Sequence, residues 1–221
     1  MVLLGCAPRP PQHPFELTPG RGDGSSARRL LLAPMNALQP LPAAELSAGA
    51  GRVFAQVQDY LAASEKSFAL LEGGKLQRAA LRGSRNAGPL SVALSDLQPA
   101  AVRELLGEGG DPPCDALVLP DIVIRQAELE GRFARWDGVK RQHPGSFGAT
   151  WSGNTSAASL RVRIFAADGE RVFEGFGGLD LLFRPVISEK RMEPMENLLS
   201  DQWNLRQGVA VAFHPYLELR R

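Results

Sequence analysis

The chain has 221 residues, of which 44% are hydrophobic, and this is enough for one sizeable core or at most two small ones. Its 25 basic and 24 acidic residues leave a net charge of +1, which excludes a strong field that would attract nucleic acid or an anionic membrane surface. No run approaches the roughly 18 consecutive apolar residues of a transmembrane helix, so we expect any membrane attachment to be covalent.

The first six residues contain the pattern of a bacterial lipobox. Leu3 and Leu4 are apolar, Gly5 is small, and Cys6 would receive the lipid. We expect the basic and apolar regions of a signal peptide to lie upstream of this sequence. Lipidation at Cys6 with more than one acyl chain would hold the protein firmly, and Ala7 is compatible with sorting to an outer membrane. The alternative interpretation is an unmodified cysteine in an unstructured tail.

Residues 7–26 are rich in proline and glycine and contain few apolar side chains. Such a segment cannot bury enough apolar surface to offset the entropy lost on folding. The sequence therefore predicts two parts. Residues 1–26 form the lipobox and a disordered tether, and residues 27–221 form a single domain.

The first half of this domain contains short predicted strands separated by helices. An apolar run over 28–34, closed by a proline, predicts a buried strand. Apolar residues at helical spacing predict an amphipathic helix over 51–63, with an inner face formed by Val53, Val57, Tyr60 and Leu61. Three further elements are expected: a strand over 67–71, one or two helical turns over 75–82, and a helix over 99–106.

The third quarter of the chain is the most strongly apolar. Residues 116–124 predict one buried strand, in which Pro120 indicates a bulge or an edge position. A turn at Gly131 leads to a partner strand over 132–140. Residues 159–166 alternate apolar and basic side chains, which predicts a half-exposed strand.

The last part of the chain is predicted to close the sheet and end in a helix. Asp168 and Gly169 predict a hairpin turn into a return strand over 171–182. In that strand, Gly175, Gly177 and Gly178 indicate a bulged or tightly packed segment rather than a phosphate-binding loop. A final helix is expected over 201–213. The order of elements predicts one α/β domain, a mixed β-sheet with helices packed on it.

Five segments of the chain resemble the periplasmic domains of bacterial envelope-assembly lipoproteins: 30–36 (LLLAPMN), 114–120 (CDALVLP), 136–138 (WDG), 159–162 (SLRV) and 177–180 (GGLD). This superfamily includes the curli secretion lipoprotein, the lipoprotein activators of peptidoglycan synthases and the amino-terminal domain of the Tol propeller protein. The resemblance covers roughly residues 27–215. It implies a protein that binds other envelope proteins or self-assembles, and that is not an enzyme.

Two tryptophans and an aspartate are the candidate partner-binding residues. Trp136 and Asp137 would form an aromatic contact beside a charge, and Trp151 follows on a later segment. The alternative interpretation of the first two is a strand tryptophan covering the sheet beside an Asp-Gly turn. A pocket containing these three residues together with Asn154 and Ser156 would instead indicate small-molecule binding.

Several kinds of chemistry are not indicated by the sequence. The three histidines, His13, His143 and His214, are far apart, so no metal site and no cofactor is predicted. Glu128 and Glu130 are more simply explained by cross-strand pairing with arginines than as catalytic carboxylates. Cys114 is interpreted as a buried structural thiol, although a disulfide with Cys6 would be compatible with an oxidising compartment.

These observations lead to two functional hypotheses. The first is a lipoprotein at the periplasmic face of the outer membrane, anchored through Cys6, that binds an envelope protein or a second copy of itself and does not bind nucleic acid. The second is a soluble periplasmic domain that binds or hydrolyses a small molecule.

Overall fold

The computed structural model describes residues 15–17, 27–84, 97–108, 113–142, 151–186 and 191–217. Cys6 lies outside the described residues. In the described part of the chain, a central sheet contains eight strands. They are β1 (Phe15–Leu17), β2 (Arg29–Leu32), β3 (Ser67–Leu70), β4 (Ala116–Gly131), β5 (Phe133–Trp136), β6 (Val139–Gln142), β7 (Trp151–Ala166) and β8 (Arg171–Leu181).

The sheet combines parallel and antiparallel pairing along the order β1-β8-β7-β4-β2-β3. Strand β2 is parallel to both β3 and β4, whereas β4, β7, β8 and β1 pair antiparallel. The hairpin of β5 and β6 extends the sheet from the far end of β4. The chain is therefore an α/β domain with a mixed sheet, as the sequence predicts.

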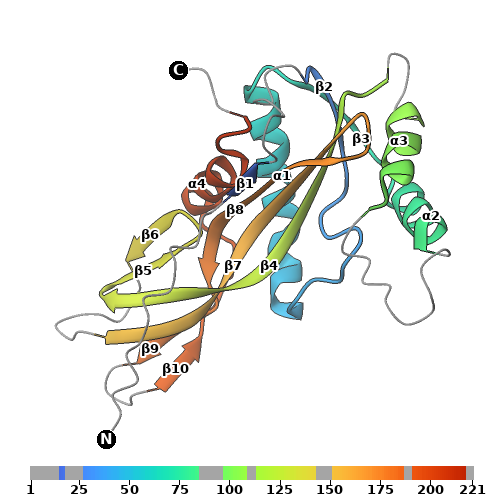
Figure 1. Cartoon of the computed structure of the whole chain (residues 1–221). Coiled ribbons are helices and arrows are strands. Elements are labelled where there is room, and N and C mark those ends of the chain that lie inside the picture. Colours follow the sequence, from blue (N-terminus) through green and yellow to red (C-terminus); the bar gives the residue numbers. More distant parts are fainter. Residues whose placement is uncertain are drawn as a thin grey trace, which may run out of the picture.

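Helices cover both faces of the sheet (Figure 1). They are α1 (Ser47–Ala63), α2 (Gly73–Ser84), α3 (Pro99–Glu108) and α4 (Gln202–Phe213), with a short 3-10 helix at Ala44–Leu46. Helices α1 and α4 enclose one hydrophobic cluster against the sheet, and α2 and α3 enclose a second cluster on the opposite face. The fold thus has three layers, and the predicted inner face of α1 is buried as expected.

Strand β2 lies between these two clusters. Leu30 and Leu32 belong to the cluster under α1 and α4, while Leu31 belongs to the cluster under α2 and α3. All three side chains are almost completely buried. Because helices cover both faces here, the strand contains consecutive apolar residues instead of an alternating pattern.

Strands β4 and β7 pair over 16 residues each and extend beyond the helices (Figure 1). Strand β2 pairs with β4 only as far as Val118, so no strand of the described chain lies beside Pro120 on that side of β4. The Pro120 carbonyl oxygen instead accepts a hydrogen bond from the backbone of Asn36 at 3.1 Å. The pairing with β7 continues through Pro120 without a register shift. Of the two predictions for this proline, the edge position is the one observed.

The segment predicted as one partner strand is a hairpin of two short strands, β5 and β6. Asp137 and Gly138 form its turn with φ angles of 35° and 76°, and positive φ at both positions is the signature of the tight turn that Asp-Gly favours. Strands β9 (Phe183–Val186) and β10 (Arg191–Pro194) form a separate small sheet. We did not predict this pair of strands from the sequence.

A strand also forms inside the segment predicted as a tether. The backbone of Phe15–Leu17 pairs antiparallel with β8, with Phe15 opposite Gly175. Thus β1 occupies one end of the sheet order, and the prediction of a disordered segment over 7–26 did not include it.

Helix α4 lies directly on the backbone of β8. A Cβ atom at Gly177 would overlap the carbonyl oxygen of Gly208, and one at Gly175 would overlap that of Ala212. The interpretation of these strand glycines as a tightly packed segment is therefore confirmed. The close contact fixes α4 beside α1, with Val209 and Phe213 in the shared core.

The prediction of a half-exposed strand over 159–166 is wrong. Leu160, Val162 and Ile164 are buried on one face, but Arg163 is also only 1% exposed on the other. Its guanidinium donates a hydrogen bond to the carboxylate of Asp121 at 2.8 Å. Buried arginine is tolerated when it is paired, and its partner lies on a strand far away in the sequence.

Candidate functional site

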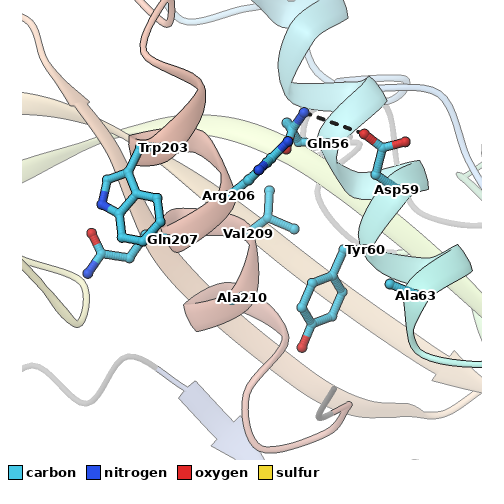
Figure 2. Close-up of a pocket in the computed structure, with 9 residues that line it drawn as sticks. All are labelled: Gln56, Asp59, Tyr60, Ala63, Trp203, Arg206, Gln207, Val209 and Ala210. Atoms are coloured by element: carbon cyan, nitrogen blue, oxygen red, sulfur yellow. Dashed lines mark hydrogen bonds between the residues drawn. The ribbon is translucent and has the colours of Figure 1, made fainter. Parts of the chain in front are cut away.

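A hollow lies between helices α1 and α4 (Figure 2). We call it the α1–α4 groove, and its volume is about 600 Å³. Nine residues line it: Gln56, Asp59, Tyr60 and Ala63 from α1, and Trp203, Arg206, Gln207, Val209 and Ala210 from α4.

The floor of the groove is apolar and firmly held. The hydroxyl of Tyr60 donates a hydrogen bond to the carbonyl oxygen of Leu217 at 2.8 Å, and the ring stacks on Phe213 with centroids 5.1 Å apart. Val209 is buried beside them. Because the Tyr60 hydroxyl is engaged below, the side chain presents mainly its ring to the groove.

Trp203 stands at one end of the groove (Figure 2). It is 74% exposed, an unusual position for the largest apolar side chain. Asp201 caps α4 by accepting hydrogen bonds from the backbone of Trp203 and Asn204 at 2.9 and 3.1 Å. This cap fixes the first turn of α4 and thereby the position of the indole.

The two walls of the groove carry opposite charges. Asp59 lies on α1, where it accepts a hydrogen bond of 3.5 Å from Gln56, and Arg206 lies on α4. In the described part of the chain no ion pair joins Asp59 to Arg206. An apolar centre with an exposed tryptophan and a polar rim is the composition of protein-binding surfaces.

The sequence predicts α4 but not this groove, because the spacing of apolar residues in the helix indicates only the face that is buried. The helix has a buried stripe at Leu205, Val209 and Phe213. A second stripe runs along its outer side at helical spacing: Trp203, Arg206, Gln207 and Ala210. A tryptophan in the second stripe was the available signal.

The predicted partner-binding residues Trp136 and Asp137 are buried, 4% and 3% exposed. The Asp137 carboxylate accepts hydrogen bonds from Ser159 at 2.7 Å and from Arg125 at 3.1 Å. The Trp136 indole donates to the carbonyl oxygen of Ala158 at 3.4 Å. This is the alternative interpretation of the pair, a strand tryptophan beside an Asp-Gly turn, and these contacts hold the β5–β6 hairpin on the sheet.

Arg141 completes this attachment. Its guanidinium donates to the carbonyl oxygens of Leu179, Gly178 and Asn204, the last at 2.9 Å, and lies 5.2 Å from the ring centre of Trp136. Burial lowers the pKa of Arg141 to about 10, and the nearby Asp180 opposes that shift. The side chain remains a cation at neutral pH and joins β6 to β8 and to α4.

The pocket predicted around Trp151, Asn154 and Ser156 takes a different form. Asn154 and Ser156 line an open depression of about 380 Å³ with residues of β4, among them Arg125. The side chain of Trp151 lies outside the described residues, although its backbone pairs with Gly131. Since Trp136 and Asp137 are enclosed, the side chains that the structure describes do not line one shared cavity.

Glu130 pairs with Arg135 across neighbouring strands at 3.4 Å, as predicted. Cys114 is 3% exposed within the cluster under α2 and α3, and burial raises the pKa of its thiol. The buried structural thiol is therefore confirmed. Among the described residues, no group of acidic, histidine and cysteine side chains is arranged to hold a metal ion, and no helix is long and apolar enough to cross a membrane.

Asp180 joins β8 to the segment before α4. Its carboxylate accepts hydrogen bonds from the backbone of Leu181 at 2.9 Å and Leu199 at 2.8 Å. Burial raises the pKa of Asp180, and these hydrogen bonds partly oppose that effect. The contact positions the chain that leads to the Asp201 cap and hence to Trp203.

Comparison with known proteins places few limits on function. No protein-family model matches the chain, and no curated protein matches it. One solved structure that is similar to it, a proposed neuraminyllactose-binding hemagglutinin homolog from Helicobacter pylori, has 10% sequence identity and a TM-score of 0.34. The match covers 88% of this chain and 87% of the other. At this TM-score it does not establish a shared fold.

Proposed function

We propose that this chain is an envelope lipoprotein, anchored through Cys6 at the periplasmic face of the outer membrane, whose α1–α4 groove binds a protein partner. The observation that carries the binding part is the exposed indole of Trp203 above an apolar floor. Exposed tryptophans bordered by polar side chains are enriched among the residues that dominate protein interfaces.

The anchoring part of the proposal comes from the sequence. Leu3, Leu4 and Gly5 precede Cys6 in the order that a lipobox requires. The described helices contain no membrane-spanning segment, so a lipid on Cys6 would be the route by which this part of the chain is held at a membrane.

Metabolic labelling with a clickable fatty acid tests the anchor. The experiment uses the gene expressed from its natural locus in its bacterial host. We expect a labelled band for the natural chain and loss of that band in the Cys6→Ala variant. The Cys114→Ala variant is the matched control and should keep the label, because its thiol is buried in the domain. An unlabelled natural chain would contradict the anchor.

Small-molecule binding in the same groove is the second candidate function. The groove volume of about 600 Å³ falls within the range of about 300–1,000 Å³ that ligand pockets occupy. Such pockets usually enclose most of their ligand, whereas Trp203 projects outward with 74% of its surface exposed. Protein binding is therefore favoured. A library of apolar ligands that raises the thermal unfolding temperature of the natural chain, but not of Trp203→Ala, would favour the second candidate.

A further inference from the structure

We infer that the partner seated on the α1–α4 groove is a second copy of this chain, related by a two-fold axis that runs along the groove. The inference rests on the proposed use of this groove for protein binding. The groove and its two walls would then form a surface that is complementary to itself.

The first argument is the distribution of charge across the groove. Asp59 lies on the α1 wall and Arg206 on the α4 wall, and neither forms an ion pair within the described residues. A two-fold axis that runs along the groove places the α1 wall of one copy against the α4 wall of the other, and an isologous interface makes every such contact twice. Two reciprocal pairs between Asp59 and Arg206 would then form.

The second argument is that the face contains both a projecting group and a hollow. The indole of Trp203 is 74% exposed at one end of the groove, and the floor of the groove is formed by apolar side chains such as Tyr60 and Val209. In a two-fold arrangement the Trp203 side chain of each copy enters the groove of the other. A volume of about 600 Å³ accommodates an indole ring.

The third argument is that little repulsion opposes the approach of two copies. The net charge of the whole chain is +1, and proteins with net charge near zero associate more readily than strongly charged ones. The small side chains of Ala63 and Ala210 also line the groove and allow helices to approach closely. The two ion pairs at the rim would determine the relative orientation more than the affinity.

Sedimentation of the full chain carrying Cys6→Ser tests this inference without lipid and without a disulfide through Cys6. We expect a reversible dimer of twice the 23.8 kDa chain mass at concentrations of about 1–100 µM. Trp203→Ala should weaken dimerisation at least about tenfold. Leu70→Ala removes another exposed apolar side chain, 58% exposed on β3, and should leave the dissociation constant within about twofold.

Charge reversal gives the sharper test. Asp59→Arg alone places two cations opposite each other, and Arg206→Asp alone places two anions opposite each other, so each variant should be monomeric. A mixture of the two variants in equal amounts restores both complementary pairs and should form a heterodimer. Only folded chains can regain dimerisation in the mixture, so misfolding of a variant cannot produce this result. Arg78→Asp on α2 is the matched control and should dimerise normally.

A Cys6→Ser chain that stays monomeric over this concentration range, or charge-reversed variants that do not form a heterodimer when mixed, would overturn the inference. The proposed function would fail separately. Crosslinking from the groove in cells to a protein of another mass would support the proposed function with a different partner and contradict the second copy. A dimer without fatty-acid labelling would support the second copy and contradict the lipid anchor.

Discussion

Asp121 and Arg163 form an ion pair of 2.8 Å between two side chains that are 0% and 1% exposed. Arg161 adds a second cation to the same carboxylate oxygen of Asp121 at 3.0 Å. The other carboxylate oxygen is buried and has no hydrogen-bond partner among the described residues. This cluster connects the central strands β4 and β7, so its disruption affects the middle of the sheet.

Removal of the central carboxylate should cost much of the domain's stability. In Asp121→Ala the charge of Arg163 stays buried without this partner, and we expect a loss of about 3–5 kcal/mol in the free energy of unfolding. Urea denaturation followed by circular dichroism measures it. Glu104→Ala, which removes an exposed pair with Arg82, is the control with an expected loss below about 1 kcal/mol. Equal losses in the two variants would contradict this account.

The close packing of α4 on β8 predicts opposite effects for two glycine substitutions. Gly177→Ala introduces a methyl group into the backbone of Gly208 and should lower the free energy of unfolding by about 1–3 kcal/mol or more. Gly51 lies on the open side of α1, where an added Cβ would meet nothing within 4 Å beyond its own helix backbone, so Gly51→Ala should raise the free energy of unfolding by about 0.5–1 kcal/mol. Thermal unfolding of both variants checks this. A neutral Gly177→Ala would mean that α4 does not lie directly on the strand.

Asp180 should make the domain's stability depend on pH. Burial raises its folded pKa above the ordinary value of 3.8, so the folded state binds the proton more tightly than the unfolded state. Its contribution is fully present below that ordinary value and is lost as pH rises through the raised folded pKa. Asp180→Asn cannot ionise, so its stability relative to the natural chain should increase with pH across this window. A constant or falling difference in urea titrations would show that the pKa is not raised.

The burial of Cys114 predicts slow chemistry at its thiol. A thiol with a raised pKa and 3% exposure reacts only when the structure opens. In the Cys6→Ser chain, we expect reaction with Ellman's reagent to be at least about a hundredfold slower in buffer than in denaturant. Rapid reaction in buffer would place this thiol at the surface.

Much of the fold follows from the spacing of apolar residues. The helical spacing of Val53, Val57 and Tyr60 and the apolar run around Leu31 predict α1 and β2, because local patterns directly record which faces are buried. The Asp168-Gly169 turn between β7 and β8 is equally local. Burial of Arg163 could not be predicted, since its partner Asp121 lies 42 residues away and alternation of charged and apolar residues normally indicates solvent on one side.

The candidate site was less accessible to sequence reasoning. Trp136 and Asp137 are a conspicuous pair in the sequence, but they hold the β5–β6 hairpin on the sheet. Trp203 stands out as a binding residue only once α4 is known to lie beside α1, because the groove forms between two helices that are distant in the chain. Periodicity predicts each helix, but it does not predict which helices are neighbours.

The most direct test of a lipid-anchored protein that binds through this groove is site-specific photocrosslinking in intact cells. A photoreactive amino acid is placed at Ala63 in the α1–α4 groove or at Arg78 on the opposite helix layer. We predict a discrete protein adduct from position 63 in the membrane fraction, none from position 78, and loss of the adduct from that fraction when Cys6→Ala prevents anchoring. No adduct from position 63, or the same adducts from both positions, would contradict the account.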